Sequence, residues 1–207
     1  MSFTKIVASS CDLVLASGSP RRHDILDQIG VLHRVVIPYI DESQRTAESA
    51  TSYVSRLALE KASAGCLMHN LNVPVLGADT ILVSEGHVFG KPIDYSDFKA
   101  MFTALSGKTH SVLSAVAVNN GTESLVLLSE TSVTFRAVTE PEVIMYWNTG
   151  EPKDKAGGYA IQGYGSIFVE HIKGSYSGVV GLPIAETCRL LTEFNVPIWQ
   201  SPLRNRV

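Results

Sequence analysis

Cysteine is scarce in this sequence, and its positions suit neither cross-links nor metal binding. The three cysteines, Cys11, Cys66 and Cys188, are odd in number and far apart, which excludes a disulfide framework and a cysteine-based zinc motif. A reducing compartment is the natural inference. Long apolar runs are missing as well, and no stretch approaches the length needed to cross a bilayer, so we expect no membrane-spanning segment.

A secretory signal and an excess of one charge are also lacking. Lys5 and Asp12 interrupt the apolar character of residues 1–17, so this segment has no signal-peptide core. The 17 lysines and arginines against 20 aspartates and glutamates leave a net charge of −3. That balance argues against an extended nucleic-acid-binding surface, although it permits a local basic pocket for a small anion. We therefore expect a cytoplasmic protein with neither nucleic acid nor membrane as a partner.

Apolar residues are plentiful enough for a substantial core. The 207 residues are 45% hydrophobic, which suits one sizeable domain or two small lobes sharing a core. No internal repeat or Pro/Gly/Ser-rich linker divides the chain, so we predict a single domain over residues 1–207, built as two lobes with a central cleft.

The hydrophobic pattern predicts an α/β protein. Apolar runs and turn residues predict strands at 13–16, 33–38, 73–78, 80–90 as a hairpin, 109–118, 123–136 and 166–172. Helical spacing and capping residues predict helices from 20, at 53–65, 98–105, 139–150 and 184–194. Ser96 is the predicted cap of the third helix, and residues 151–165 read as a loop. Helices interleaved with both crossovers and hairpins indicate a mixed sheet.

The stretch LVLASGSPRRHDIL, residues 13–26, combines a strand with an unusual helix start. Ser19 fits a helix N-cap and Pro20 the first helical position. Arg21 and Arg22 then lie in the first turn, which the helix dipole makes unfavourable for cations. A phosphate would resolve the conflict, because free backbone N–H groups and two guanidinium groups would converge on it. A capped helix with both arginines in water is the alternative.

Several other ionisable residues lie where strands or helices are predicted to end. Asp79 directly follows the run VPVLGA, at a strand end where ligands of open α/β sheets bind; its alternative is a turn residue or a cap. Asp41 and Glu42 offer hard oxygen ligands for a magnesium ion, or form a solvated turn. Lys61 and Lys91 are candidate cations, or plain surface residues.

The histidines show no spacing typical of metal ligands. We interpret them as structural or surface residues: His23, His33, His69, His87, His110 and His171.

Eight short motifs occur in the order and spacing of a known family. They are LASGSPRRHDIL, DES, RLALEKA, GADT, GKPID, LSGKTHSV, DKAGGYAIQG and GSYSGVVGLP. Through them the chain, from about Leu13 to Phe194, resembles the Maf family of nucleoside triphosphate pyrophosphatases, once described as septum-formation inhibitors. The resemblance implies a two-lobed α/β fold with a mixed twisted sheet flanked by helices, related to inosine triphosphate pyrophosphatases, and a homodimer.

The resemblance also implies a reaction and a site. The reaction is hydrolysis of a nucleoside triphosphate to monophosphate and pyrophosphate with Mg²⁺ or Mn²⁺, a house-cleaning activity in nucleotide metabolism. Glu42 and Asp79 are the predicted metal ligands, with Glu42 favoured over Asp41 because the first carboxylate of DES varies within the family. Cations must neutralise the phosphates before water attacks phosphorus. The predicted catalytic residues are Glu42, Lys61, Asp79 and Lys91, and the predicted substrate-binding residues are Ser17, Arg21, Arg22, Thr80, Lys155 and Gln162.

Three residues select a branch of that family. Arg21, Thr80 and Gln162 match the branch that hydrolyses thymidine and uridine triphosphates, whereas a 7-methylguanosine triphosphate branch has tryptophan, glutamine and glutamate there. A neutral amide pairs with O4 and N3–H of a pyrimidine, while a cationic 7-methylguanine favours a carboxylate. We therefore predict a dTTP and UTP pyrophosphatase. The alternatives are a 7-methyl-GTP pyrophosphatase and a nucleotide-binding regulator of division without turnover.

Overall fold

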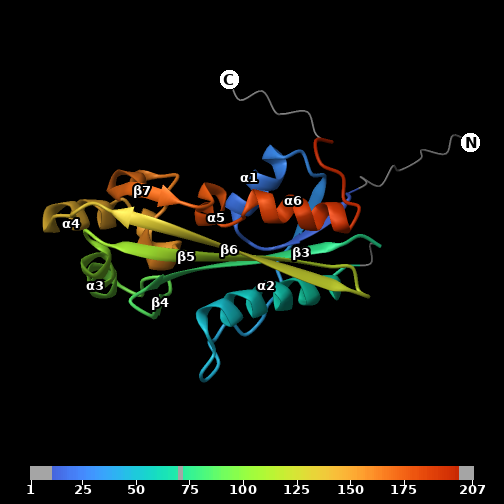
Figure 1. Cartoon of the computed structure of the whole chain (residues 1–207), viewed down its shortest axis with the longest axis horizontal. Helices are drawn as coiled ribbons and strands as arrows, with labels where there is room; N and C mark the ends of the chain where they lie inside the picture. Colours follow the sequence, from blue (N-terminus) through green and yellow to red (C-terminus); the bar gives the residue numbers. More distant parts are fainter. Residues whose placement is uncertain (1–10, 70–71, 201–207) are drawn as a thin grey trace, which may run out of the picture.

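A single mixed sheet organises the protein, for which we have a computed structural model (Figure 1). The structure describes residues 11–69 and 72–200, so Lys5 and the segment before Cys11 lie outside the described residues. The seven strands have the order β2-β1-β3-β5-β6-β7, and β4 pairs with β3 off this path. With helices on both faces, this arrangement confirms the predicted α/β class and its mixed sheet.

The sheet is parallel on one side and antiparallel on the other. The parallel strands are β1 (Leu13–Ala16), β2 (His33–Val36) and the first part of β3 (Val75–Ser84). The antiparallel strands are β4 (His87–Phe89), β5 (Thr109–Asn119), β6 (Ser124–Phe135) and β7 (Val169–Lys173). Because β3 pairs with both kinds of partner, it joins the two halves of the sheet.

The strand predicted to end before Asp79 does not end there. β3 continues through Asp79 and Thr80 to Ser84, held along its length by β5, with Asp79 opposite Ala115. The polar pair suggested a strand end because it interrupts an apolar run. In the structure only the parallel partner ends there. The last β1–β3 pair is Ala16 with Gly77, so Asp79 and Thr80 lie on the part of β3 that extends beyond β1.

Helices cover both faces of the sheet (Figure 1). One face carries α2 (Ala50–Cys66), and the other carries α1 (Pro20–Gln28), α5 (Tyr176–Val180) and α6 (Ile184–Glu193). Two more helices, α3 (Tyr95–Leu105) and α4 (Glu140–Asn148), lie near the start of β5 and the end of β6. The faces alternate along β5, so that Val116 packs towards α1 and α6 whereas Ala115 packs towards α2.

Some local predictions need correction. Asp94, not Ser96, caps α3, because its carboxylate accepts a hydrogen bond from the Asp97 amide at 2.9 Å. The strand predicted from residue 166 begins at Val169, after a 3₁₀ turn, η3 (Tyr164–Phe168). The predicted loop before it holds two more such turns, η1 (Glu151–Asp154) and η2 (Ala156–Gly158). The short α5 was not predicted, since its glycine- and serine-rich sequence has no helical periodicity.

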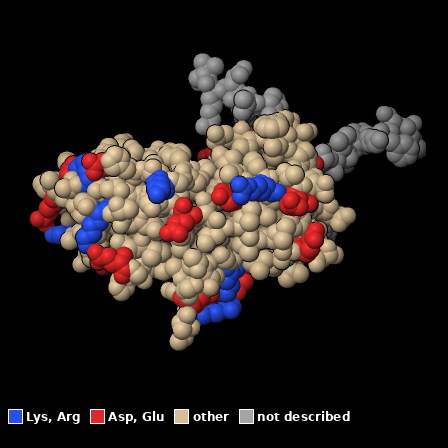
Figure 2. Space-filling view, in the orientation of Figure 1, with Lys and Arg blue, Asp and Glu red and all other residues tan. Residues whose placement is uncertain are grey.

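Two large apolar clusters fill the two ends of the molecule. One joins β1 and the first part of β3 to α1 and α6, and the other joins Leu82 to the aromatic rings of α3, α4 and β6. Within the described residues, no helix is long and apolar enough to cross a membrane. On the face drawn in Figure 2, lysines and arginines lie beside aspartates and glutamates. The single-domain boundaries at residues 1 and 207 stay a prediction.

Candidate active site

A cavity of about 640 Å³ opens along the edge of β3. On this edge β1 pairs only as far as Gly77 and β4 pairs only from Leu82, so among the described strands none covers residues 78–81. Side chains from both faces of β3 reach the space, because no neighbouring strand separates them. All ten residues predicted from the sequence line this cavity: Ser17, Arg21, Arg22, Glu42, Lys61, Asp79, Thr80, Lys91, Lys155 and Gln162.

A lysine and two carboxylates form the charged centre of the cavity wall. Lys61 Nζ donates to Asp79 Oδ1 at 2.7 Å and pairs with Glu42 Oε1 at 2.9 Å. The Lys61 and Asp79 side chains are only 11% and 12% exposed, whereas Glu42 is 57% exposed. A buried charge is tolerated when opposite charges and hydrogen bonds satisfy it, and this ammonium group has two carboxylates. Both acids therefore point at one position occupied by a cation.

A glycine on β3 brings α2 close enough for this contact. A Cβ atom at Gly77 would lie 2.2 Å from the Ala58 carbonyl oxygen and 2.4 Å from the Ala62 amide nitrogen. No side chain fits at such distances, so the helix backbone rests directly on the strand. Gly77 and Asp79 project from the same face of β3, because alternate residues share a face. The close packing of α2 on Gly77 therefore places the Lys61 ammonium group within hydrogen-bonding distance of Asp79.

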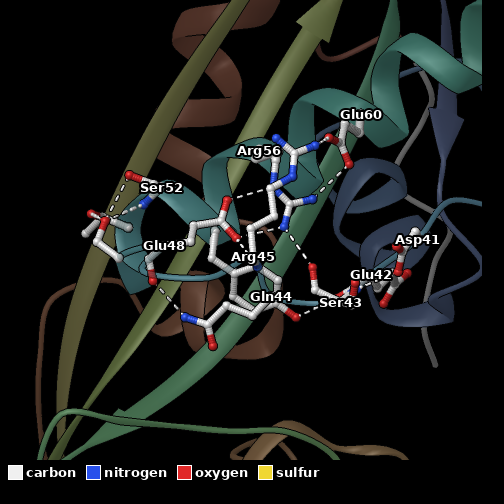
Figure 3. A network of polar contacts seen from close by, with 12 residues as sticks. Asp41, Glu42, Ser43, Gln44, Arg45, Glu48, Ser52, Arg56 and Glu60 are labelled. Carbon is white, nitrogen blue, oxygen red and sulfur yellow. Dashed lines mark hydrogen bonds and ion pairs between the residues drawn. The ribbon is translucent and has the colours of Figure 1, made fainter.

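The loop that carries Glu42 is fastened to α2 by an arginine (Figure 3). Arg56 donates to both Glu48 oxygens at 2.6 and 2.8 Å, and to the Ser43 carbonyl at 2.9 Å. These hydrogen bonds lower the pKa of Glu48 to about 2. Asp41 makes a local contact instead: its carboxylate accepts a hydrogen bond from the Ser43 amide at 2.9 Å, and the residue does not line the cavity. The geometry thus favours Glu42 over its neighbour.

Arg22 ties the start of α1 to α5. Its Nη1 donates to Ser17 Oγ at 3.0 Å and its Nε donates to the Gly181 carbonyl at 2.8 Å. Burial lowers the pKa of Arg22, although the charge of Asp79 acts in the opposite direction; the guanidinium remains charged at neutral pH. Ser19 occupies the predicted N-cap position, but its side chain makes no capping hydrogen bond. The helix start therefore turns backbone N–H groups and a guanidinium towards the cavity region, as anion binding requires.

A second group of cations lies around Asp154. Its carboxylate pairs with Arg21 Nη1 at 3.6 Å and also with Lys155 Nζ, which donates in addition to the Glu151 carbonyl at 3.3 Å. Lys91 lines the same cavity and makes no ion pair with any residue that the structure describes. Positive groups from α1, from the segment after β4 and from the junction between η1 and η2 thus line one cavity.

Uncharged polar side chains line the cavity as well. Ser114 Oγ donates to the Gly178 carbonyl at 2.6 Å, so the Thr80 hydroxyl, 2.9 Å from Ser114 Oγ, is the donor of that pair. Gln162 lies on the segment that follows η2, and its side chain is exposed on the cavity wall. These groups offer hydrogen bonds and no net charge, which suits recognition of a neutral base.

Sequence reasoning missed residues that hold the site in place. Tyr53 OH donates to the Glu42 carbonyl at 2.7 Å, a contact that its place in a predicted helix did not indicate. Glu151 accepts from Tyr146 OH at 2.7 Å and from the amides of Tyr164 and Gly165 at 3.0 and 2.9 Å. These bonds fasten both ends of the segment that carries Lys155 and Gln162. A lone glutamate in a charged loop gave no signal for that role.

The residues present fit a divalent cation. Glu42 and Asp79 supply hard oxygen atoms that already meet at one positive charge, the ammonium group of Lys61. Mg²⁺ is held in proteins by one or two carboxylates together with substrate phosphates. A pair of carboxylates on the wall of a cavity lined by arginine and lysine therefore matches that donor set.

The chain is similar to known proteins over most of its length. Residues 12–194 match a family model described as Maf-like protein. A Saccharophagus degradans protein named dTTP/UTP pyrophosphatase is 51% identical over 196 residues, 93% of each chain. A Salmonella typhimurium protein of the same name is 50% identical over 183 residues, covering 88% of this chain and 93% of that protein. The structure of the Staphylococcus aureus Ham1 protein has 14% identity and a TM-score of 0.48, covering 88% of this chain and 97% of that one.

Proposed function

The chain belongs to the Maf family, as its motifs predict, and on this premise we propose that it is a pyrophosphatase that hydrolyses dTTP and UTP to the monophosphate and pyrophosphate. Relatives of about half identity that carry this name support the reaction. The observation that carries the proposal is the cavity itself, in which Glu42 and Asp79 converge on Lys61 while Arg21 and Arg22 stand at the start of α1.

The positive groups of the cavity suit a triphosphate. The substrate brings about four negative charges, and attack on phosphorus requires those charges to be neutralised. In this proposal Arg22 and the backbone N–H groups of α1 hold one phosphate, and Arg21, Lys91 and Lys155 hold the others. Asp154 pairs with Arg21 and Lys155, so the substrate phosphates compete with its carboxylate for these two cations.

Asp79 is the group that orients the water. Lys61 occupies its Oδ1, which leaves Oδ2 to accept a hydrogen bond from water and then its proton. The oxygen of that water bonds to the α-phosphorus while the bond to the bridging oxygen breaks, and pyrophosphate leaves. Glu42 and Asp79 would hold Mg²⁺ or Mn²⁺, which when bound supplies Lewis-acid stabilisation of the phosphate oxygens.

Gln162 and Thr80 belong to the base-recognition side of this proposal. The amide of Gln162 both donates and accepts, as the O4 and N3–H of thymine and uracil require. A site built from paired polar groups penalises a base that leaves those groups unmatched. The preference for dTTP and UTP over 7-methyl-GTP, ATP and dATP follows from this complementarity.

A substrate panel tests the proposal. The full-length protein is incubated with each triphosphate and Mg²⁺, and pyrophosphate and monophosphate are quantified; equal amounts of both, with dTTP and UTP fastest, are expected. In ¹⁸O-labelled water the label should enter the monophosphate, and label in pyrophosphate would indicate attack at the β-phosphorus. A panel led by 7-methyl-GTP would overturn the branch, and binding without any turnover would favour the regulator hypothesis.

Three further statements belong to the same proposal. Activity depends on Mg²⁺ or Mn²⁺, so a chelator should abolish it and either ion should restore it. The active form is a homodimer, for which light scattering on the purified protein should return twice the chain mass. The enzyme acts in the cytoplasm, where its substrates are made, and fractionation of the source cells should find it there.

A further inference from the structure

Three potential metal ligands meet outside the cavity, between α1 and β2. His23, Asp27 and His33 each offer one ligand atom, and these atoms all lie within 4.8 Å of one another. His23 Nδ1 lies 2.7 Å from His33 Nε2, and His23 Nε2 lies 3.5 Å from Asp27 Oδ2. None of the three lines the active-site cavity. The cluster therefore belongs to no part of the proposed reaction.

Helix geometry and a tight connection bring these residues together. His23 and Asp27 are four residues apart on α1, so their side chains share one face of the helix. The chain then turns through Gly30, with φ of 71°, and starts β2 at His33. The spacing of these residues in the sequence predicted only structural or surface histidines, because His33 joins the pair through the fold.

His33 is held in the form that binds a metal. Its Nδ1 donates to the Val31 carbonyl at 2.9 Å, which leaves Nε2 with a lone pair that faces the other two residues. A hydrogen bond from the distal ring nitrogen to a carbonyl is the usual support of a metal-bound histidine. The orientation is thus set by the backbone.

We propose that His23, Asp27 and His33 bind one zinc ion, or a similar divalent transition metal, at a site separate from the cavity. Two imidazoles and one carboxylate are a donor set typical of Zn²⁺, and the partial exposure of the cluster leaves room for water as a fourth ligand. One ion takes only one nitrogen of His23, and Nδ1 is the one that faces His33. Tetrahedral ligands at zinc lie about 3.4 Å apart, so the distance between His23 Nδ1 and His33 Nε2 opens by roughly 0.7 Å and the Asp27 carboxylate moves towards them. Both changes are of side-chain scale.

The ion would tie α1 to the neighbouring strand. Arg21 and Arg22, which line the cavity, precede His23 directly on the same helix. Zinc at this site therefore fastens the helix that presents both arginines, without touching the cavity.

Zinc titration of the full chain tests the proposal. Calorimetry, or competition with a chromophoric chelator, should show a zinc site whose affinity His33→Gln and His23→Gln each weaken at least tenfold. Zinc at 100 times Kd should raise the Tm of the wild type by about 5 °C or more and leave His33→Gln unchanged. Circular dichroism without zinc verifies that both variants are folded.

Two control variants locate the ion. His171→Gln removes an exposed histidine of β7, and Asp79→Asn removes a carboxylate of the cavity; both should retain wild-type zinc binding. Loss of binding in Asp79→Asn, but not in His33→Gln, would place the ion in the cavity and overturn the proposal. Absence of zinc binding in the wild type would overturn it equally and would leave only a surface hydrogen-bond network, whatever the outcome of the substrate panel.

Discussion

Replacing Lys61 by methionine removes the cation that both cavity carboxylates share. Methionine keeps an unbranched apolar stem of similar length, so the packing of α2 on β3 should survive. Asp79 is then left buried without its partner at 2.7 Å, opposite the carboxylate of Glu42. The substitution therefore tests whether the lysine is a structural requirement of the site as well as part of its chemistry.

The expected loss of stability follows from burial. Breaking one side of a buried pair costs about 3–5 kcal/mol, because the remaining charge has no compensation. More than half of the Glu42 side chain is exposed, so this carboxylate can reorient into solvent. We therefore discount its contribution to the loss of stability. We expect a decrease in the free energy of unfolding of about 2–4 kcal/mol, which for a chain of this size lowers the Tm by roughly 5–15 °C.

A surface lysine provides the matched control. Lys108 Nζ pairs with Glu85 Oε1 at 2.7 Å, the same distance as Lys61 to Asp79, but these side chains are 48% and 66% exposed. Lys108→Met should cost under about 1 kcal/mol in urea denaturation at the same salt concentration. Mg²⁺ should restore part of the stability of Lys61→Met, since in the proposed function a divalent cation would bind the same two carboxylates. Equal losses in both variants would refute the reasoning, because burial would then have no effect.

Four other predictions test separate parts of the structure. Asp79→Asn should lower kcat for pyrophosphate release by at least about 100-fold, whereas Asp41→Asn, whose carboxylate faces Ser43, should stay within about twofold; equal effects would contradict the assignment. Gln162→Glu should reduce kcat/KM for dTTP and UTP by about tenfold, since a carboxylate cannot donate to O4 and repels the substrate, and unchanged kinetics would remove Gln162 from base recognition. Burial lowers the pKa of His110 from 6.5 to about 4, so the stability that its neutral form contributes is present above pH 6.5 and is lost as the pH falls towards 4. His110→Phe should flatten the wild-type curve of unfolding free energy in that window, by up to roughly 3 kcal/mol, and parallel curves would contradict this. Gly77→Ala should lower the free energy of unfolding by more than about 2 kcal/mol, because its Cβ would meet the backbone of α2, and a Tm near that of the wild type would show that the helix can move away.

The order of helices and strands was predictable, whereas their exact ends were not. Periodicity and capping residues identified α2 and the hairpin of β5 and β6 because each has a regular pattern and clear turn residues. β3 was predicted too short, since Asp79 and Thr80 look like a strand end until the neighbouring strands β1 and β4 are known to leave that edge free. Which strands pair, and over which residues, depends on contacts between segments that are distant in the sequence, so the local pattern of one sequence does not predict it.

In the candidate site, the identity of the residues was predictable, whereas their contacts with one another were not. Ordered motifs named ten residues that line one cavity, because motif spacing reflects a shared fold. The sharing of one lysine by two acids was not predictable, since it depends on the approach of α2 at Gly77. The His33 contact was missed for a similar reason: the turn at Gly30, and not any periodicity, brings it to α1.

The uncovered stretch of β3 has a mechanical consequence. β3 is held by β5 from Val75 to Val83, and β5 by β6 over its whole length, so the floor of the cavity is a continuous plate of hydrogen-bonded strands. Two domains joined by a hinge can close over a cleft between them, whereas a continuous sheet cannot bend in that way at the cavity. The segments around Glu42, Lys91 and Lys155 form the rim of the cavity and lie outside this sheet, so they are the parts of the site that are free to move without breaking it. In the proposed reaction, substrate entry and product release would then depend on how often the contacts that hold these segments break, while β3 beneath the cavity stays in place.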